Sequence, residues 1–94
     1  SLNQNYPNPF NPSTKIKFQI PLLRGVDAVG GRGVSTKLTI YDVLGKEVQV
    51  LVNQQLQPGT YEVNFDGSSY PSGIYFYKLT AGSFSAVNKM VLLK

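Results

Sequence analysis

The acidic and amide side chains are the residues best suited to chemistry. The chain has five Asp and Glu residues and neither histidine nor cysteine, which excludes His-based acid–base chemistry, thiol catalysis and the usual zinc sites. The carboxylates lie at expected turns or on solvent-facing strand positions, with no pair placed in a cleft. The oxygen ligands that could suit calcium are dispersed without loop-motif spacing, so turn capping explains them better: Asp42, Asn53, Glu62, Asn64 and Asp66. We predict a domain that is not an enzyme and needs no metal or cofactor.

The tyrosines offer a second kind of chemistry, because aromatic faces can stack on sugar rings. The candidates for such a platform are Tyr41, Tyr61, Tyr70, Tyr75 and Tyr77. Most of them lie in register with apolar positions of the expected strands, which favours burial over sugar binding.

Composition predicts one small globular domain. The chain has 94 residues, of which 41% are hydrophobic and 15% charged. Its net charge is +4, but no two basic residues are adjacent, so a nucleic-acid partner is not expected. No apolar run has the length of a membrane span, and residues 1–4 do not resemble a secretory signal peptide. We expect no membrane insertion; an export address would lie elsewhere in a longer precursor or in this module itself.

Apolar and polar residues alternate with a period of two almost throughout, which predicts strands. Residues 74–79 are apolar or aromatic on both faces, so this strand is expected to be central in its sheet. No window has the periodicity of a helix. The six expected strands are residues 15–20, 37–41, 47–52, 61–65, 74–79 and 84–93. Their spacing predicts an all-β antiparallel sandwich of six to seven strands, the seventh coming from the opening segment or from a split last strand.

Turn residues separate these strands. Asp42 can cap a turn in which Gly45 takes a positive φ, and Pro58 with Gly59 predicts a type II turn. The segment 22–35 contains four glycines and no pattern, so we expect a mobile loop.

The opening segment contains Pro7, Pro9 and Pro12, each preceded by Tyr or Asn, with Tyr6 and Phe10 among them. Proline fixes φ, removes a backbone donor and favours extended geometry in the preceding residue. We therefore expect residues 1–13, called the strap below, to pack on or lead into a sandwich formed by residues 14–94.

Five blocks cover nearly the whole chain: residues 4–14, 40–48, 58–61, 72–77 and 89–94. In this order they resemble the C-terminal sorting domains of the type IX secretion system. In build, the domain is similar to the immunoglobulin-like module of flagellar hook-capping proteins. The loop 22–35 is longer than these domains usually carry.

The resemblance implies an immunoglobulin-like fold and an address carried by a larger cargo fused to the N-terminus. Such cargo crosses the inner membrane on an N-terminal signal of its precursor. In the periplasm, the outer-membrane translocon recognises the folded C-terminal domain. A sortase-like peptidase then removes the domain at the surface, or the cargo is joined to lipopolysaccharide. The product is at the cell surface or secreted.

The last segment is the candidate for translocon recognition. As an edge strand it would present unpaired backbone groups to which a partner could add a strand. It can equally be an ordinary strand that closes the sandwich, and Gly73, like Gly59 and Gly82, can serve turn geometry alone. The candidate recognition residues are Gly73, Tyr75, Lys89, Met90, Val91, Leu92, Leu93 and Lys94.

Three hypotheses follow for the function. The first is a secretion-sorting domain, which must end its polypeptide, so Lys94 is expected to be the last residue. The alternative is a carbohydrate-binding or adhesive accessory domain of an extracellular hydrolase. A structural spacer is the third.

Overall fold

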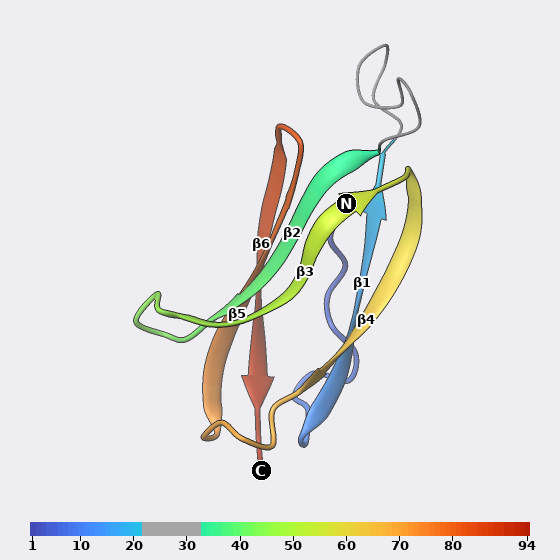
Figure 1. The fold of residues 1–94 in the computed structure, drawn as a ribbon. Coiled ribbons are helices and arrows are strands. Elements are labelled where there is room, and N and C mark those ends of the chain that lie inside the picture. Colours follow the sequence, from blue (N-terminus) through green and yellow to red (C-terminus); the bar gives the residue numbers. More distant parts are fainter. Residues whose placement is uncertain (22–32) are drawn as a thin grey trace.

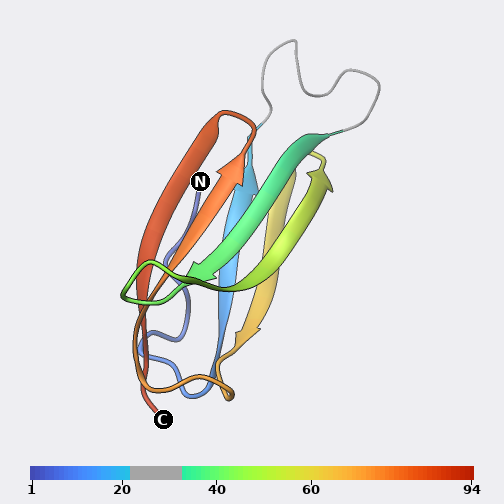
Figure 2. The ribbon, with the colours of Figure 1, turned by 60° about the vertical axis from the view of Figure 1, so that its left-hand side comes forward.

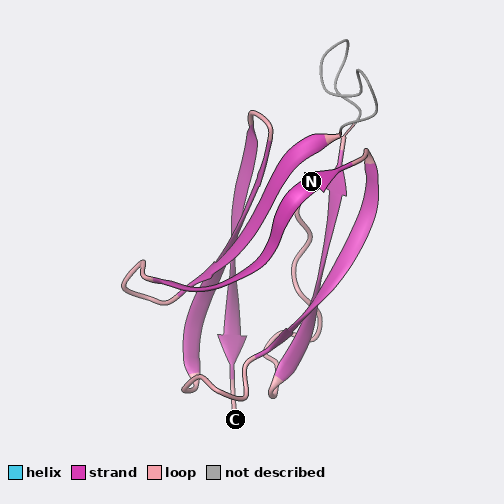
Figure 3. Cartoon of the chain, in the orientation of Figure 1, coloured by secondary structure: helices cyan, strands magenta, loops and turns pink. Residues whose placement is uncertain are grey.

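The computed structural model describes residues 1–21 and 33–94. These residues form six strands and no helix, as expected (Figure 1, Figure 3). No helix of this described part could span a membrane. The strands are β1 (Ser13–Ile20), β2 (Val34–Tyr41), β3 (Glu47–Leu56), β4 (Gly59–Asp66), β5 (Gly73–Ala81) and β6 (Phe84–Leu92).

The strands form two antiparallel sheets, one with the order β1-β4 and one with the order β3-β2-β5-β6 (Figure 2). The central position predicted for residues 74–79 is confirmed, since β5 lies between β2 and β6. The fold is the antiparallel, immunoglobulin-like β-sandwich that the pattern and the resemblance predicted.

The core lies between the sheets because alternate side chains of β1, β4, β5 and β6 point inward. Ile16, Phe18 and Ile20 of β1 are buried, whereas the residues between them are exposed. Phe65 of β4 is also buried and stacks on Tyr70, with ring centroids 5.8 Å apart. The facing predicted for these strands is therefore confirmed.

Two local predictions are wrong. Val34 and Ser35 were expected in the loop 22–35, but they belong to β2, where pairing with Leu56 and Gln55 continues the ladder. The rest of the predicted loop, residues 22–32, lies outside the described residues. Gly59 has a φ of 152°, far from the roughly +80° of a type II turn, because it already begins β4.

The strap contacts both sheets without forming a seventh strand. Its bridges are isolated: Leu2 pairs with Phe18 and Tyr6 with Lys15, both on β1, and Phe10 pairs with Leu92 on β6. The last segment is also one strand. The prolines of the strap lack a backbone N–H and so prevent it from pairing continuously with a neighbouring strand. The described residues therefore form six strands and not seven.

Candidate interaction surface

The end of β6 presents alternate residues to solvent. Met90 and Leu92 are fully buried in the core, whereas Lys89 and Lys94 are exposed and Leu93 is 53% exposed. Val91 is half-buried. Within β6 the pattern follows from the period of two, since each inward residue fixes an outward neighbour. Leu93 and Lys94 follow the end of the strand and are both exposed. Of the predicted recognition residues in this segment, four present side chains at the surface of the folded domain.

The two recognition candidates on β5 differ. Gly73 is half-buried and pairs with Leu92, so it lies beside the end of β6. Tyr75 is buried, and its hydroxyl donates a hydrogen bond to the carbonyl of Pro71 at 2.7 Å. Burial raises the pKa of Tyr75 above 10.0, with smaller contributions from the charges of Asp42 and Tyr70. The Tyr75 ring therefore supports the end of the sandwich from within.

The strap covers the edge of β6 that was expected to be free. The N–H of Phe10 donates to the carbonyl of Val91 at 2.9 Å, and the N–H of Leu93 donates to the carbonyl of Phe10 at 2.9 Å. Asn8 Oδ1 accepts from the N–H of Val91 at 3.0 Å, and Gln4 Nε2 donates to the carbonyl of Lys89 at 2.7 Å.

The expectation of unpaired backbone groups is therefore wrong at these positions. The strap begins against β1 and then passes to β6, so it occupies the side of the sandwich between the two sheets (Figure 2). The sequence predicted a docked strap but not which strand edge it would cover.

Lys94 is held at the base of the sandwich. Its backbone N–H donates to Ser72 Oγ at 3.0 Å, and its Nζ donates to the carbonyl of Ser68 at 2.7 Å. The backbone N–H of Ser68 in turn donates to Asp66. This hydrogen bond lowers the pKa of Asp66 below 3.8, helped by the side chain of Ser68 and by the charge of Lys94. The predicted turn-capping role of Asp66 is thereby confirmed.

A buried hydroxyl, which the sequence analysis did not single out, joins the strap to the central strand. The hydroxyl of Tyr77 accepts from the N–H of Asn5 at 2.8 Å and donates to the carbonyl of Asn3 at 2.7 Å. Asn88 Nδ2 lies 3.3 Å from the same oxygen. Burial raises the pKa of Tyr77 above 10.0, against the hydrogen bonds from Asn88 and Asn5 that lower it. A tyrosine at an inward position of a central strand was the available signal, because its hydroxyl needs a partner when buried.

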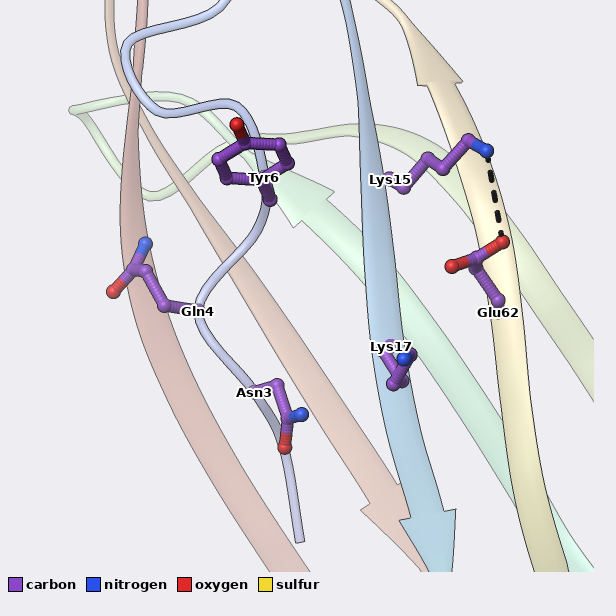
Figure 4. Close-up of a pocket in the computed structure, with 6 residues that line it drawn as sticks. All are labelled: Asn3, Gln4, Tyr6, Lys15, Lys17 and Glu62. Atoms are coloured by element: carbon purple, nitrogen blue, oxygen red, sulfur yellow. Dashed lines mark ion pairs between the residues drawn. The ribbon is translucent and has the colours of Figure 1, made fainter.

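The cavity beside the strap is polar. It has a volume of about 260 Å³ and contains the ion pair between Lys15 Nζ and Glu62 Oε1 at 3.8 Å (Figure 4). Both side chains are largely exposed, so the pair contributes little. Glu62 is the one carboxylate among the lining residues, so this cavity lacks the pair of carboxylates that acid–base catalysis would use. The lining residues are Asn3, Gln4, Tyr6, Lys15, Lys17 and Glu62.

The tyrosine rings are largely engaged inside the protein. Tyr61 stacks on Phe18 at 5.6 Å, and Tyr70 packs between Phe65 and Tyr75 at 5.8 and 6.2 Å. Together with the burial of Tyr77, these contacts leave most of the proposed sugar platform facing inward. In residues 1–21 and 33–94, no three acidic side chains gather as metal ligands.

The fold and these surfaces define a small β-sandwich of the binding-module class, whose last strand presents a short exposed row. The family described as "Secretion system C-terminal sorting domain" matches residues 4–93, and the chain belongs to it. It is a sorting domain of the type IX secretion system, which directs its cargo into that export route toward the cell surface or the medium and so interacts with the secretion machinery. Domains of this family act as sorting signals and are not catalytic. Neither the curated proteins nor the solved structures gave a match.

Proposed function

We propose that the outer-membrane translocon of the type IX system recognises this domain in its folded form, in the periplasm, while a larger cargo is fused to its N-terminus. A sortase-like peptidase then acts on the exported product. The observation that carries the proposal is the match of the sorting family over residues 4–93, which include all six strands of the sandwich. Catalysis, where the whole protein has any, belongs to the cargo.

The surface that we assign to recognition is the exposed row at the end of β6 with the glycine beside it. Lys89, Val91, Leu93 and Lys94 point outward, and Gly73 lies next to them on β5. The remaining candidates, Tyr75, Met90 and Leu92, are buried and hold this row in place from the core. The strap occupies the adjoining edge, so contact would be made through side chains and not by strand addition at Val91.

We also propose that the two parts of the chain have different roles. Residues 1–13 act as the strap and residues 14–94 as the sandwich that bears the recognition row. Phe10 supports this division, since its ring is buried in the core while its backbone is hydrogen-bonded to Val91 and Leu93. The strap would thus keep the end of β6 in a fixed position relative to the cargo junction.

The test is a periplasmic reporter fused to residues 1–94 in a host with a working type IX system. Lys89→Ala with Leu93→Ser should reduce export of the reporter, because both side chains lie at the surface of the row. The matched control is Lys17→Ala with Lys37→Ser, which changes exposed residues elsewhere on β1 and β2. Equal export of both double variants would exclude the end of β6 as the recognition surface.

A further inference from the structure

The strap is hydrogen-bonded to two strands of the sandwich at once. Its first half lies along β1 in antiparallel order. Ser1 exchanges backbone hydrogen bonds with Gln19 at 2.8 and 2.9 Å, and further along Tyr6 exchanges two with Lys15, both at 3.0 Å. Residue 1 therefore lies toward one end of the sandwich, whereas residue 94 lies at the other (Figure 1).

Along β6, in contrast, the strap runs in the same direction as its partner strand. Near the start of the strap, Gln4 Nε2 donates to the carbonyl of Lys89. Further along, the backbone of Phe10 is hydrogen-bonded to Val91 and then to Leu93, and the bridge at Phe10 is parallel. The first segment and the last strand of the domain thus lie side by side and point the same way.

This arrangement determines how the domain responds to a pull on its two ends. Tension that draws residue 1 away from residue 94 would slide the strap and β6 past each other in opposite directions. Hydrogen bonds between strands run across the strand direction, so a sliding force acts on all of them together. A peeling force would instead open them one at a time. Under end-to-end tension, the strap therefore leaves β6 only when several bonds break in one step.

The far end of the strap is anchored in the core. The ring of Phe10 is 1% exposed and packs edge-on against Phe65, with ring centroids 5.9 Å apart. The carbonyl of Pro12 accepts from the N–H of Gly67 at 2.7 Å, which ties the strap to the loop after β4. Sliding the strap would draw an aromatic ring into water, so the burial of Phe10 opposes the same motion as the hydrogen bonds. Tension from residue 1 reaches β1 only after passing this anchor.

We propose that the strap is a mechanical clamp, which transmits tension from a cargo joined ahead of residue 1 to β6 and keeps the sandwich folded under that tension. The inference rests on the proposed function for the source of the tension, because a translocon that holds the recognition row would pull against the cargo. The row and the clamp share one strand. Lys89 and Val91 present side chains to a partner, while their backbone carbonyls accept hydrogen bonds from the strap.

The clamp is tested on the purified 94-residue chain, held at constant force between handles at residues 1 and 94. Gln4→Ala with Asn8→Ala removes two side-chain hydrogen bonds to β6 and should raise the unfolding rate about fivefold, the effect of losing roughly one net hydrogen bond that resists the pull. The matched control is Asn53→Ala with Gln54→Ala, which changes two exposed residues of β3 and should leave the rate within about twofold. Asn8→Asp keeps the oxygen that accepts from the N–H of Val91, so it should also stay within about twofold of the unaltered chain.

The direction of the pull is the second test. Ser83 is exposed in the turn between β5 and β6, at the end of the sandwich away from residue 94 (Figure 1). With handles at residues 1 and 83, the tension peels the strap away from its first residue onward. The strap should then detach at a lower force than with handles at residues 1 and 94, because its bonds open in turn.

The clamp and the proposed function fail in different ways. Equal unfolding rates in the Gln4→Ala, Asn8→Ala chain and the unaltered chain, an equal rise in the control, or equal forces in the two directions would overturn the clamp. The proposed function would stand in each case, since the pulling experiments contain no translocon. Retention of the unaltered reporter fusion in the periplasm of a type IX-competent host would overturn the proposed function, whatever the force measurements give.

Discussion

Tyr77→Phe tests whether the strap is fastened to the central strand by one buried hydroxyl. The substitution keeps the ring and removes only the oxygen that accepts from Asn5 and donates to Asn3. Asn5 is 2% exposed, so its N–H would lose its partner without gaining water. An unsatisfied buried donor costs about 1–3 kcal/mol. We expect a loss of about 2 kcal/mol in the free energy of unfolding, or about 10 °C in melting temperature for a domain of this size.

Denaturant unfolding of the 94-residue chain measures this loss, with an unchanged m value showing that the transition is comparable. Hydrogen exchange at the Asn5 amide should accelerate, since local opening of the strap becomes easier. The control is Tyr61→Phe, whose hydroxyl donates to the carbonyl of Gln57 at an exposed site where water can replace it. It should cost under about 0.5 kcal/mol. Equal stability of the two variants, with unchanged exchange at Asn5, would refute the fastening role.

Three further predictions concern the core. Phe65→Ala should cost about 3–5 kcal/mol in a denaturation experiment, because the ring is fully buried; near-normal stability would contradict the facing of β4. Gly67→Ala should cost about 1–3 kcal/mol in free energy of unfolding, because the new Cβ would lie 3.0 Å from Leu92 Cδ2 and 3.1 Å from the carbonyl oxygen of Pro12. Unchanged stability would show that Leu92 and Pro12 can move to make room for it. Burial raises the pKa of Tyr77, so its contribution to stability is complete below pH 10 and is lost as the pH rises through the folded-state value. The loss of stability as the pH rises above about 10 should therefore be shallower in Tyr77→Phe, and an equal loss in the two proteins would contradict the assignment.

The two-layer fold could be predicted because the alternation of apolar and polar residues is strong. The inward set of β1, namely Ile16, Phe18 and Ile20, follows from period two alone. The central position of β5 follows from its apolar character on both faces. The ends of the strands were harder to predict. Val34 and Ser35 follow a glycine-rich stretch, and their place in β2 depends on pairing with residues of β3 that are distant in sequence.

The candidate site was only partly predictable. Alternation distinguishes the outward Lys89 from the inward Met90, so the exposed row could be deduced once the last segment was assigned as a strand. The covering of this strand by the strap depends on contacts such as those between Phe10 and Val91, which are about 80 residues apart in sequence. No local sequence pattern predicts a contact between residues that are so far apart in the chain.

The most direct test of the central claim compares two isogenic hosts, one with a working type IX translocon and one without it, both carrying the periplasmic reporter fused to residues 1–94. The measured quantity is the fraction of reporter found at the cell surface and in the medium. We expect the reporter to reach the cell surface or the medium in the host with the translocon and to stay in the periplasm of the host without it. Export of the fusion in the host without the translocon, or its retention in the host with it, would show that this domain is not a type IX sorting signal.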